Sequence, residues 1–417
     1  MNVSVFTDDG KIMRNKSQKM AAALVSVAVV AAGGSAQAFA ADMDKARAVQ
    51  NAPAAQGVSP EGAATQAAGT LGAINPDQLS QVLGSSGNPA FAGSTIMGSA
   101  DALGFSPDLF AGNTPLPPAP DPSITETKVL RKTVDEGRYE QWEIAYAPMQ
   151  RVITIEIYRA ATDGPAPNLY LLDGVGSERP SGFMLWNAKE QFKNENVNLV
   201  IPTGGQASMW ADWQQQDPKL GISKWESFIT EALPKLTAES QIGLKHNGKN
   251  GIGGISMGAA SAYSIAVRHP EQYQGVFGLS GCYTTDDFGQ ILTRYTVESR
   301  GANVQNMWGP PGSEEWQAHD AISQAEKLRG KALYLSSGTG AAKEGEFEAY
   351  NGDIGNFVAG AALEQASNVC THRMTEKLDD LDIDHRFDQI PAGLHNWSLF
   401  APQMPIAWNH IKGALGA

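Results

Sequence analysis

Cysteine, basic residues and long apolar runs are all scarce in this chain of 417 residues. The two cysteines allow one disulfide at most. The 31 lysines and arginines are outnumbered by 44 acidic residues and do not cluster as they do in proteins that bind nucleic acid, so no nucleic-acid partner is expected. No apolar run after the first 40 residues resembles a transmembrane helix. The excess of acidic groups favours solubility.

The first 40 residues have the composition of an export signal. Basic residues at positions 11–19 precede an apolar stretch over residues 21–32, and Ala38 and Ala40 each fit the end of a small-x-small cleavage site. A membrane anchor is the weaker alternative, because the apolar stretch is shorter than the roughly 20 residues that span a bilayer. We therefore predict a signal peptide over residues 1–40, cleaved near Ala38 or Ala40. The mature chain would be secreted or associated with the cell envelope, without a transmembrane helix.

Residues 41–122 form a low-complexity segment rich in alanine, glycine, serine, proline and glutamine, with few aromatic side chains. Such a segment buries too little apolar surface to offset its conformational entropy, so we predict that it is mostly disordered. The composition changes near Ser123, and a folded domain is predicted over residues 123–417. Its two cysteines, Cys282 and Cys370, are predicted to form a disulfide because export exposes the chain to oxidants. Two buried thiols are the alternative.

Short apolar or alternating segments, typical of strands, alternate with helical segments throughout the predicted domain. This order predicts an α/β fold in which a mostly parallel central sheet is flanked by helices on both faces. Loops at the carboxyl ends of the strands would then hold the catalytic residues. The predicted strands cover residues 139–146, 151–158, 169–172, 197–201, 251–253, 275–279, 332–335 and 384–389, and the predicted helices cover residues 183–192, 224–236, 259–268, 314–328, 357–381 and 403–415.

Residues 254–258 read G-I-S-M-G and fit the motif G-x-S-x-G. In enzymes with this motif, a strained turn between a strand and a helix exposes the serine as a nucleophile. Residues 251–253 and the small-residue helix over 259–268 supply that context. The flanking glycines are needed because a Cβ at either position would collide with the neighbouring strand and helix. Ser256 is therefore the predicted nucleophile, and the backbone N–H of Met257 is a predicted donor to an oxyanion.

A serine nucleophile needs a base, and the chain contains seven histidines. His395 alone follows a predicted strand, which places it in a loop at the same sheet edge as Ser256. The order of serine before histidine also matches the order in α/β-hydrolases. His395 is therefore the predicted general base. The other six lie at the wrong end of the sheet, in helices or at a strand start: His246, His269, His319, His372, His385 and His410.

A carboxylate is expected behind the histidine, where it would orient the ring and stabilise its cation. The residues alone leave three acids open for this position: Glu344, Asp353 and Glu364. The second oxyanion donor is expected from an earlier loop at a strand end, and residues 173–175 are the best candidate. An ordinary turn is the alternative for that loop.

Four further stretches match the motifs of one enzyme family. Residues 171–174, L-L-D-G, are similar to a substrate and oxyanion loop, and residues 201–213 are similar to a long G-G-Q-x-S segment that ends in D-W. Residues 306–310 are similar to an M-W-G-P loop, and residues 395–397, H-N-W, to the sequence H-S-W. With these motifs, residues 125–415 resemble the mycolyltransferases of mycolate-bearing actinobacteria, which include the mycobacterial antigen 85 proteins. The resemblance implies an α/β-hydrolase fold.

The resemblance also implies roles for individual residues. It assigns the nucleophile to Ser256 and the base to His395. It selects Glu364 as the acid, because the family's glutamate lies on the helix before the last strand and Glu364 lies 31 residues before His395. The backbone N–H groups of Val175 and Met257 would form the oxyanion hole.

Substrate contacts are implied by the same resemblance. Asp173 is expected to contact the trehalose sugar, and Trp397 is expected to line the site beside the histidine. Gly176 occupies a position where the family often has an arginine, a departure that bears on trehalose affinity. Residues 283–313 are expected to help cover the acyl chain, with a plain surface excursion as the alternative.

The family's activity implies a secreted acyltransferase that moves mycoloyl groups from trehalose monomycolate to a second trehalose monomycolate or to cell-wall arabinogalactan. The reaction would proceed through an acyl-enzyme on Ser256. Its partners would be trehalose mycolates and glycolipid or arabinogalactan acceptors of the envelope, and neither a cofactor nor a metal ion is expected. The alternatives are a secreted carboxylesterase, a mycoloyltransferase that acts on protein serines, and an envelope adhesin that kept the fold without catalysis.

Overall fold

The computed structural model describes residues 115–177, 179–350 and 354–417. The predictions for the signal peptide and for most of the low-complexity segment fall outside these residues. The chain divides into two compact units. The described residues of the smaller unit are 339–350, 354–365 and 391–394, and those of the larger unit are 115–177, 179–338, 366–390 and 395–417.

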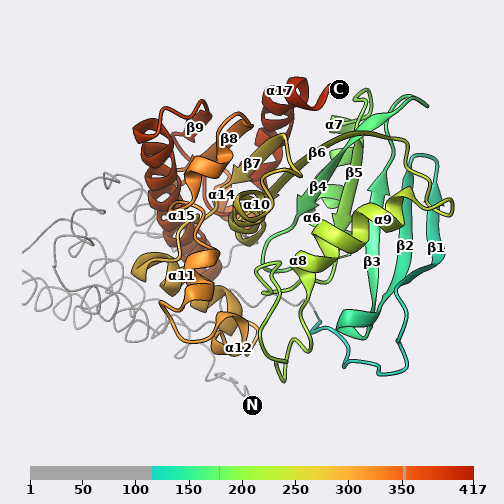
Figure 1. Ribbon diagram of the computed structural model, residues 1–417. Helices are drawn as coiled ribbons and strands as arrows, with labels where there is room; N and C mark the ends of the chain where they lie inside the picture. The colour runs from blue at the N-terminus through green and yellow to red at the C-terminus, as the bar shows by residue number, and fades with distance from the viewer. Residues whose placement is uncertain (1–114, 178, 351–353) are drawn as a thin grey trace, which may run out of the picture. The chain divides into compact units, whose positions relative to one another are not determined.

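A single nine-stranded sheet lies wholly within the larger unit, with β1 and β9 at its two edges (Figure 1). Five of the eight strand pairings are parallel, and the three antiparallel pairings join β1, β2, β3 and β5. The predicted mostly parallel sheet is therefore confirmed. In spatial order the strands are β1 (Lys128–Glu136), β2 (Tyr139–Tyr146), β3 (Arg151–Tyr158), β5 (Asn198–Pro202), β4 (Ala166–Leu172), β6 (His246–Ile255), β7 (Gly275–Leu279), β8 (Ala332–Gly338) and β9 (Arg386–Ile390).

Helices cover both faces of this sheet, as predicted. The apolar core on one face contains side chains from α8 (Trp225–Ser227), η3 (Phe228–Ala232), α9 (Leu233–Ala238) and α10 (Met257–Arg268). The core on the other face contains side chains from α6 (Gly182–Leu185), α7 (Ala188–Gln191), α16 (Trp397–Phe400) and α17 (Met404–Leu415). The remaining helices are η2 (Ala147–Met149), α11 (Asp287–Glu298), α12 (Gln305–Trp308), α13 (Glu314–Ala318), η4 (Ala325–Leu328), α14 (Glu346–Ala349), α15 (Ile354–Asp380) and η5 (Ala401–Gln403).

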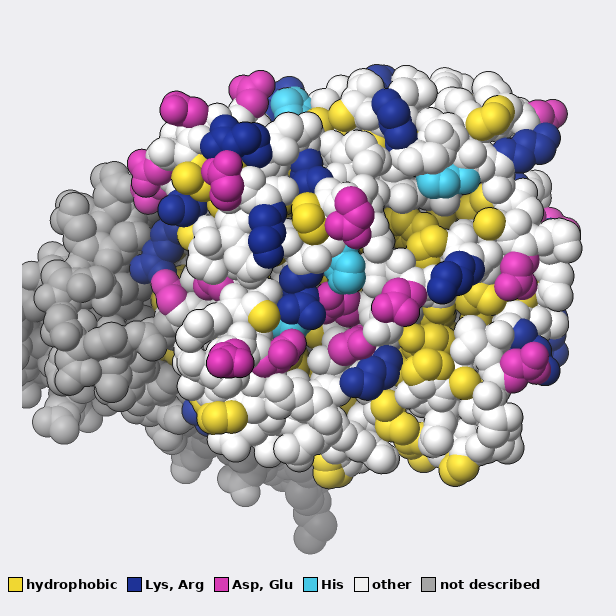
Figure 2. Space-filling view, in the orientation of Figure 1, with side chains coloured by type: hydrophobic (Ala, Val, Ile, Leu, Met, Phe, Trp, Pro, Cys, Tyr) yellow, Lys and Arg dark blue, Asp and Glu magenta, His cyan; other side chains and the backbone are white. Residues whose placement is uncertain are grey.

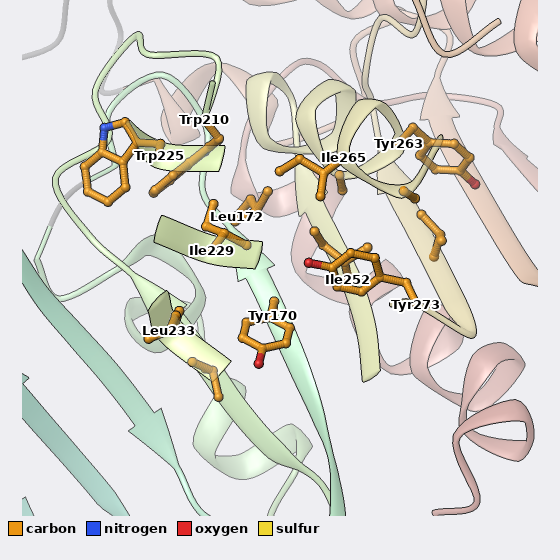
Figure 3. Close-up of a cluster of buried hydrophobic side chains, with 14 of the residues drawn as sticks. Tyr170, Leu172, Trp210, Trp225, Ile229, Leu233, Ile252, Tyr263, Ile265 and Tyr273 are labelled. Carbon is orange, nitrogen blue, oxygen red and sulfur yellow. The ribbon is translucent and has the colours of Figure 1, made fainter. Parts of the chain in front are cut away.

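The two cores meet at strands that are buried on both faces, and β4 shows the pattern most clearly. All seven of its residues are buried. Tyr170 and Leu172 belong to the core under α10, which Figure 3 shows, whereas Leu169 and Leu171 belong to the core under α17. Successive strand side chains point to opposite faces, so a continuous apolar run is what a doubly covered strand requires. Each fully buried leucine contributes about 1.5–3 kcal/mol.

A third apolar cluster joins residues 201–213 to residues 306–310, two of the segments that carry the resemblance to mycolyltransferases. It contains Ala207, Ala211 and Trp213 of the first segment and Met307 and Trp308 of the second. The backbone N–H groups of residues 214 and 215 donate to the carbonyl oxygens of residues 307 and 306, at 2.9 Å each. These two segments therefore form one supporting layer, which contacts α10 where the hydroxyl of Ser261 donates to the carbonyl oxygen of Met209 at 2.7 Å.

Cys282 and Cys370 form the predicted disulfide. Cys282 lies just after β7, and Cys370 lies in the part of α15 that belongs to the larger unit. Both cysteines are thereby in one unit, and the bridge ties the loop after β7 to this helix.

Several elements differ from the sequence-based expectation. The helix predicted over residues 314–328 is divided into α13 and η4, with residues 319–324 in turns between them, and α11, α12, α14 and α16 were not predicted. β1 was not expected, because its sequence K-V-L-R-K-T-V-D-E places charged residues on both faces and most of its side chains are exposed at the sheet edge. The helix predicted over residues 183–192 is divided into α6 and α7. The break falls at Trp186 and Asn187, and Asn187 has a left-handed backbone with a φ of 77°.

Acidic and basic side chains are interspersed over the face of the molecule that Figure 2 shows. Within the described part of the chain, every helix is too short or too polar to span a bilayer.

Candidate active site

Ser256 lies at the turn between β6 and α10, which is the context that its motif predicts. Its backbone has a φ of 52° and a ψ of −121°, a conformation that residues with a side chain rarely adopt. The N–H of Ser256 donates to the carbonyl oxygen of Leu279 at 2.9 Å, which ties the turn to the end of β7. The surrounding backbone thus holds a strained residue in place, as it does at many functional sites.

The glycines on either side of Ser256 are required by close backbone contacts. A Cβ on Gly258 would lie 2.0 Å from the carbonyl oxygen of Leu172, and a Cβ on Gly254 would lie 2.4 Å from the carbonyl carbon of Gly258. Both contacts are with backbone atoms, which cannot move aside as a flexible side chain could. The turn therefore packs directly against the carboxyl end of β4, where the oxyanion loop begins.

His395 lies in the loop after β9, and its Nε2 is 2.8 Å from the Oγ of Ser256. The imidazole and the ring of Phe400 pack edge to face, with centroids 5.0 Å apart and planes at 80°. This distance is within hydrogen-bonding range, so the imidazole can take the hydroxyl proton without moving. The structure therefore brings together the two side chains to which the sequence assigned nucleophile and base.

The other six histidines contact groups away from Ser256. Four have a ring nitrogen near a backbone carbonyl or an amide: His246, His319, His372 and His385. His269 lies 2.8 Å from a carboxylate oxygen of Glu226, and His410 lies beside the ring of Tyr334.

The three acids considered for the third position differ in their surroundings. Glu364 is fully buried in α15. Glu344 is exposed in the segment after β8, and Asp353 lies outside the described residues. A buried carboxylate is costly unless it is hydrogen-bonded or paired with a cation, so burial agrees with a carboxylate that has a defined partner. The pairing of Glu364 with His395 stays a prediction.

The loop after β4 is held by the side chain of Asp173, which is only 5% exposed. One carboxylate oxygen accepts a hydrogen bond from the N–H of Gly174, and the other accepts one from the N–H of Gly182 at the start of α6, both at 2.8 Å. The carbonyl oxygen of the same residue accepts from the indole N–H of Trp210 at 2.9 Å. Asp173 thus joins the loop, α6 and the supporting layer.

Val175 and Met257 are the two residues expected to donate to an oxyanion. The carbonyl oxygen of Val175 accepts a hydrogen bond from Ala207 at 3.2 Å, and its side chain packs on the third apolar cluster. Among the described residues, the N–H groups of Val175 and Met257 donate to no backbone or side-chain acceptor. A Cβ on Gly174 would lie 3.6 Å from that of Ser256, so the loop runs next to the serine. The role of these two N–H groups as oxyanion donors stays a prediction.

Four aromatic side chains beside the histidine form what we call the aromatic rim: Phe183, Trp186, Trp397 and Phe400. Of these, sequence reasoning identified only Trp397 as a site residue. Its ring packs edge to face with Phe183 and Phe400, at centroid distances of 5.2 and 6.0 Å. The sequence analysis placed Phe183 and Trp186 in one predicted helix over residues 183–192 and gave them no role in the site.

A buried ionic cluster supports the other end of the nucleophile helix. Glu226 of α8 is buried and lies 2.7 Å from the Nε of Arg268, 2.8 Å from His269 and 3.4 Å from His319. Burial alone would raise the pKa of Glu226, but the hydrogen bonds of the two histidines and the charge of Arg268 outweigh it. The pKa therefore lies below its ordinary value. This cluster ties α8 to the carboxyl end of α10.

Comparisons with known proteins agree with this geometry. The family model described as "Putative esterase" matches residues 147–411. The chain is 29% identical over 299 residues to the diacylglycerol acyltransferase/mycolyltransferase Ag85B of Mycobacterium avium, covering 67% of this chain and 84% of that protein. It is 27% identical over 292 residues to the corresponding Ag85A of Mycobacterium tuberculosis, covering 67% and 82%. The resemblance to mycolyltransferases is confirmed.

Two solved structures share the fold. The crystal structure of MPT51 (FbpC1) from Mycobacterium tuberculosis has a TM-score of 0.55 and 23% identity, and the match covers 67% of this chain and 100% of that chain. An S-formylglutathione hydrolase from Agrobacterium tumefaciens has a TM-score of 0.53 and 14% identity, with 69% and 100% covered. These likenesses concern the fold, which is that of the α/β-hydrolases.

Proposed function

Because this chain belongs to the esterase family and is an esterase or acyltransferase of the serine-hydrolase type, we propose that it transfers mycoloyl groups from trehalose monomycolate. The acceptor is a second trehalose monomycolate or cell-wall arabinogalactan. The observation that carries the proposal is the 2.8 Å distance between the Oγ of Ser256 and the Nε2 of His395, with the serine held in a strained turn. The similarity to two proteins named as acyltransferases and mycolyltransferases supports the choice of acyl group.

The first half-reaction forms an acyl-enzyme. The Oγ of Ser256 attacks the ester carbonyl carbon of the donor, and its proton passes to the Nε2 of His395. The carbonyl oxygen becomes an oxyanion next to the N–H groups of Val175 and Met257. The bond to the sugar oxygen then breaks, the imidazolium returns the proton to that oxygen, and trehalose leaves. Ser256 keeps the acyl group as an ester.

The second half-reaction repeats these steps with a sugar hydroxyl as the nucleophile. The Nε2 of His395 takes the hydroxyl proton, the sugar oxygen attacks the acyl carbon, and the bond to Ser256 breaks. The imidazolium then returns the proton to the Oγ of Ser256, so the enzyme is regenerated without a cofactor. Water would give hydrolysis by the same route, so transfer depends on how well the acceptor competes with water.

The other site residues serve this reaction in the proposal. Glu364 would orient the imidazole and stabilise its cation. Asp173 and Trp397 would contact the sugar. Loss of one buried oxyanion donor in enzymes of this type costs about 10²–10³ in kcat.

Export is a separate part of the proposal and rests on the sequence of residues 1–40. In it the signal peptide is removed near Ala38 or Ala40, residues 41–122 separate the envelope from the catalytic domain, and the domain over 123–417 acts outside the cell. Amino-terminal sequencing of the exported protein tests this part. An intact amino terminus on a protein that stays inside the cell would contradict it.

The enzymatic part is tested with trehalose monomycolate labelled in the acyl group. The proposal expects labelled trehalose dimycolate, with one free trehalose released for each dimycolate formed. Ser256→Ala should abolish both products, and Ser240→Ala, which changes an exposed serine, should not. Labelled free acid without dimycolate would instead identify a carboxylesterase, the second candidate, which the esterase family match favours. Label appearing only on added envelope proteins would identify a transferase for protein serines.

A further inference from the structure

The exposure of the tryptophans singles out one pair of side chains. Of the nine tryptophans in the sequence, two are not buried, namely Trp186, which is 44% exposed, and Trp397, which is partly buried. A single exposed apolar side chain needs no explanation. These two, however, contact each other, and Trp397 is the first residue of α16, two positions after His395. The seven buried ones are Trp142, Trp210, Trp213, Trp225, Trp308, Trp316 and Trp408.

The two indole rings lie almost parallel. Their planes differ by 11° and their centroids are 6.4 Å apart, which is within the range of offset aromatic pairs. An offset pair presents a longer flat surface than either ring alone. Trp186 thereby extends the surface of Trp397 at the point where α6 ends and solvent begins.

The inner ring of the pair, that of Trp397, is held in place before any ligand binds. A Cβ on Gly182 would lie 2.0 Å from Cζ2 of Trp397, so the indole rests directly on the backbone of α6. The N–H of Gly182 donates a hydrogen bond to the buried carboxylate of Asp173. The ring of Phe183 and the indole of Trp397 pack edge to face. Because these contacts fix the ring, binding costs little additional side-chain entropy.

The partial exposure of this surface favours a sugar over an acyl chain. An acyl chain gains about 0.8 kcal/mol for each methylene removed from water, so a site for it is expected to enclose the chain. A pyranose ring has C–H groups on its faces and hydroxyl groups around its rim. An open indole can therefore cover one face of the sugar while the hydroxyl groups remain hydrated.

We infer that Trp186 is a specificity-determining residue for the sugar part of the substrate, and that it binds a pyranose ring of a disaccharide while Trp397 lies nearer the reacting ester. The inference rests on the proposed function for the identity of the substrate. It adds a contact at the carboxyl end of α6, in a chain that has Gly176 where the family often has an arginine.

Two exposed residues at the carboxyl end of α6, Leu185 and Trp186, provide a matched test. Trp186→Ala removes one ring of the pair, and Leu185→Ala removes a side chain that is 59% exposed and next to it in the chain. Three esters of one acyl chain are compared: the 6-ester of trehalose, the 6-ester of glucose and the p-nitrophenyl ester. Trp186→Ala should raise the KM for the trehalose ester about tenfold. This factor should be at least about five times the factor by which the KM rises for either of the other two esters. Trp186→Phe should recover most of the loss, and Leu185→Ala should change no KM by more than about twofold.

A binding measurement separates this inference from the proposed function. Isothermal titration of trehalose into the Ser256→Ala protein does not depend on acyl transfer. Adding Trp186→Ala should weaken trehalose binding by about the same factor as the KM change, whether the wild-type enzyme transfers or hydrolyses. Unchanged binding, equal losses for all three esters, or an equal effect of Leu185→Ala would each overturn the inference. Equal losses would mean that Trp186 acts by positioning His395, and an equal leucine effect would mean a general apolar surface.

Discussion

The nucleophile turn and the aromatic rim meet at His395 but are built in opposite ways. The turn is formed by backbone atoms packed so closely that Gly254 and Gly258 have no room for a Cβ. The rim is formed by side chains, and its most exposed member, Trp186, is 44% exposed. Changes in the turn should therefore affect the reaction with every ester, whereas changes in the rim should affect the choice of substrate.

Ser256→Ala should give the largest effect, because no other group can carry the acyl chain. We expect kcat/KM to fall by about 10⁴ or more with both trehalose and p-nitrophenyl esters. The free energy of unfolding should change by less than about 1 kcal/mol, because only a hydroxyl is removed. Steady-state kinetics and urea unfolding measure the two quantities. A residual activity near that of the wild type would exclude Ser256 as the nucleophile.

Glu364→Gln tests whether the buried carboxylate of Glu364 is the acid that supports His395 in catalysis. A neutral amide would stabilise the imidazolium less well, so kcat should fall by about 10²–10⁴ with all esters while KM changes little. Glu344→Gln, at an exposed position, is the matched control and should retain full activity. If the two variants exchanged their effects, the assignment of the acid would move to Glu344.

Gly258→Ala should break the turn itself. The added Cβ would collide with the backbone of β4, so we expect a loss of about 3 kcal/mol in the free energy of unfolding and a large loss of activity. Gly413→Ala is the matched control, since this glycine lies in α17 with no atom within 4 Å of the added Cβ. It should stabilise the protein by up to about 1 kcal/mol. Equal stabilities of the two variants, measured by urea unfolding, would contradict the packing argument.

Glu226→Gln should reduce stability and affect catalysis less. Removing one partner of a buried ionic cluster costs about 3–5 kcal/mol at pH 7. The pKa of Glu226 in the folded protein lies below the ordinary value of 4.5, so its contribution to stability is present above pH 4.5 and is lost as the pH falls towards the folded-state value. The stability difference between wild type and variant should therefore shrink below pH 4.5.

Urea unfolding at pH 7 and pH 4 measures this dependence. Glu239→Gln, at an exposed position, serves as the control and should show no difference at either pH. A deficit of the Glu226 variant that grows as the pH falls would contradict the sign of the shift.

Gly182→Ala should give the smallest loss of activity among these variants. The loss should arise from the aromatic rim and should therefore depend on the substrate. The added Cβ would displace the indole of Trp397, because the ring now lies where that atom would be. We expect kcat/KM for the trehalose ester to fall about tenfold, with a smaller change for the p-nitrophenyl ester. Equal losses with both esters would show that the rim and the turn are not separate in function.

The sequence predicted the nucleophile turn in detail because its motif is local. Strand, turn and helix follow one another within residues 246–268, and the two glycines have a direct steric reason. The pairing of Ser256 with His395 spans 139 residues, yet it could be predicted, because the order of strands limits which loops reach the same sheet edge.

The aromatic rim could not be predicted in the same way. The contact between Trp186 and Trp397 depends on where α6 breaks, and the break follows from the left-handed backbone of Asn187. In the sequence, the aromatic residues near position 186 have the spacing of a buried helix face. β1 was missed for a related reason, since an edge strand exposed on both faces lacks the alternation that identifies strands.

Capture of the acyl-enzyme is the most direct test of the proposed reaction. The protein is mixed with trehalose monomycolate, quenched in acid within the first turnover and examined by intact-protein and peptide mass spectrometry. We predict one mycoloyl group on the peptide that contains Ser256, absent from the Ser256→Ala variant and transferred to product when trehalose monomycolate is added in excess. Product formation without this adduct, or an adduct on another residue that turns over at the rate of catalysis, would contradict the role of Ser256 as acyl carrier.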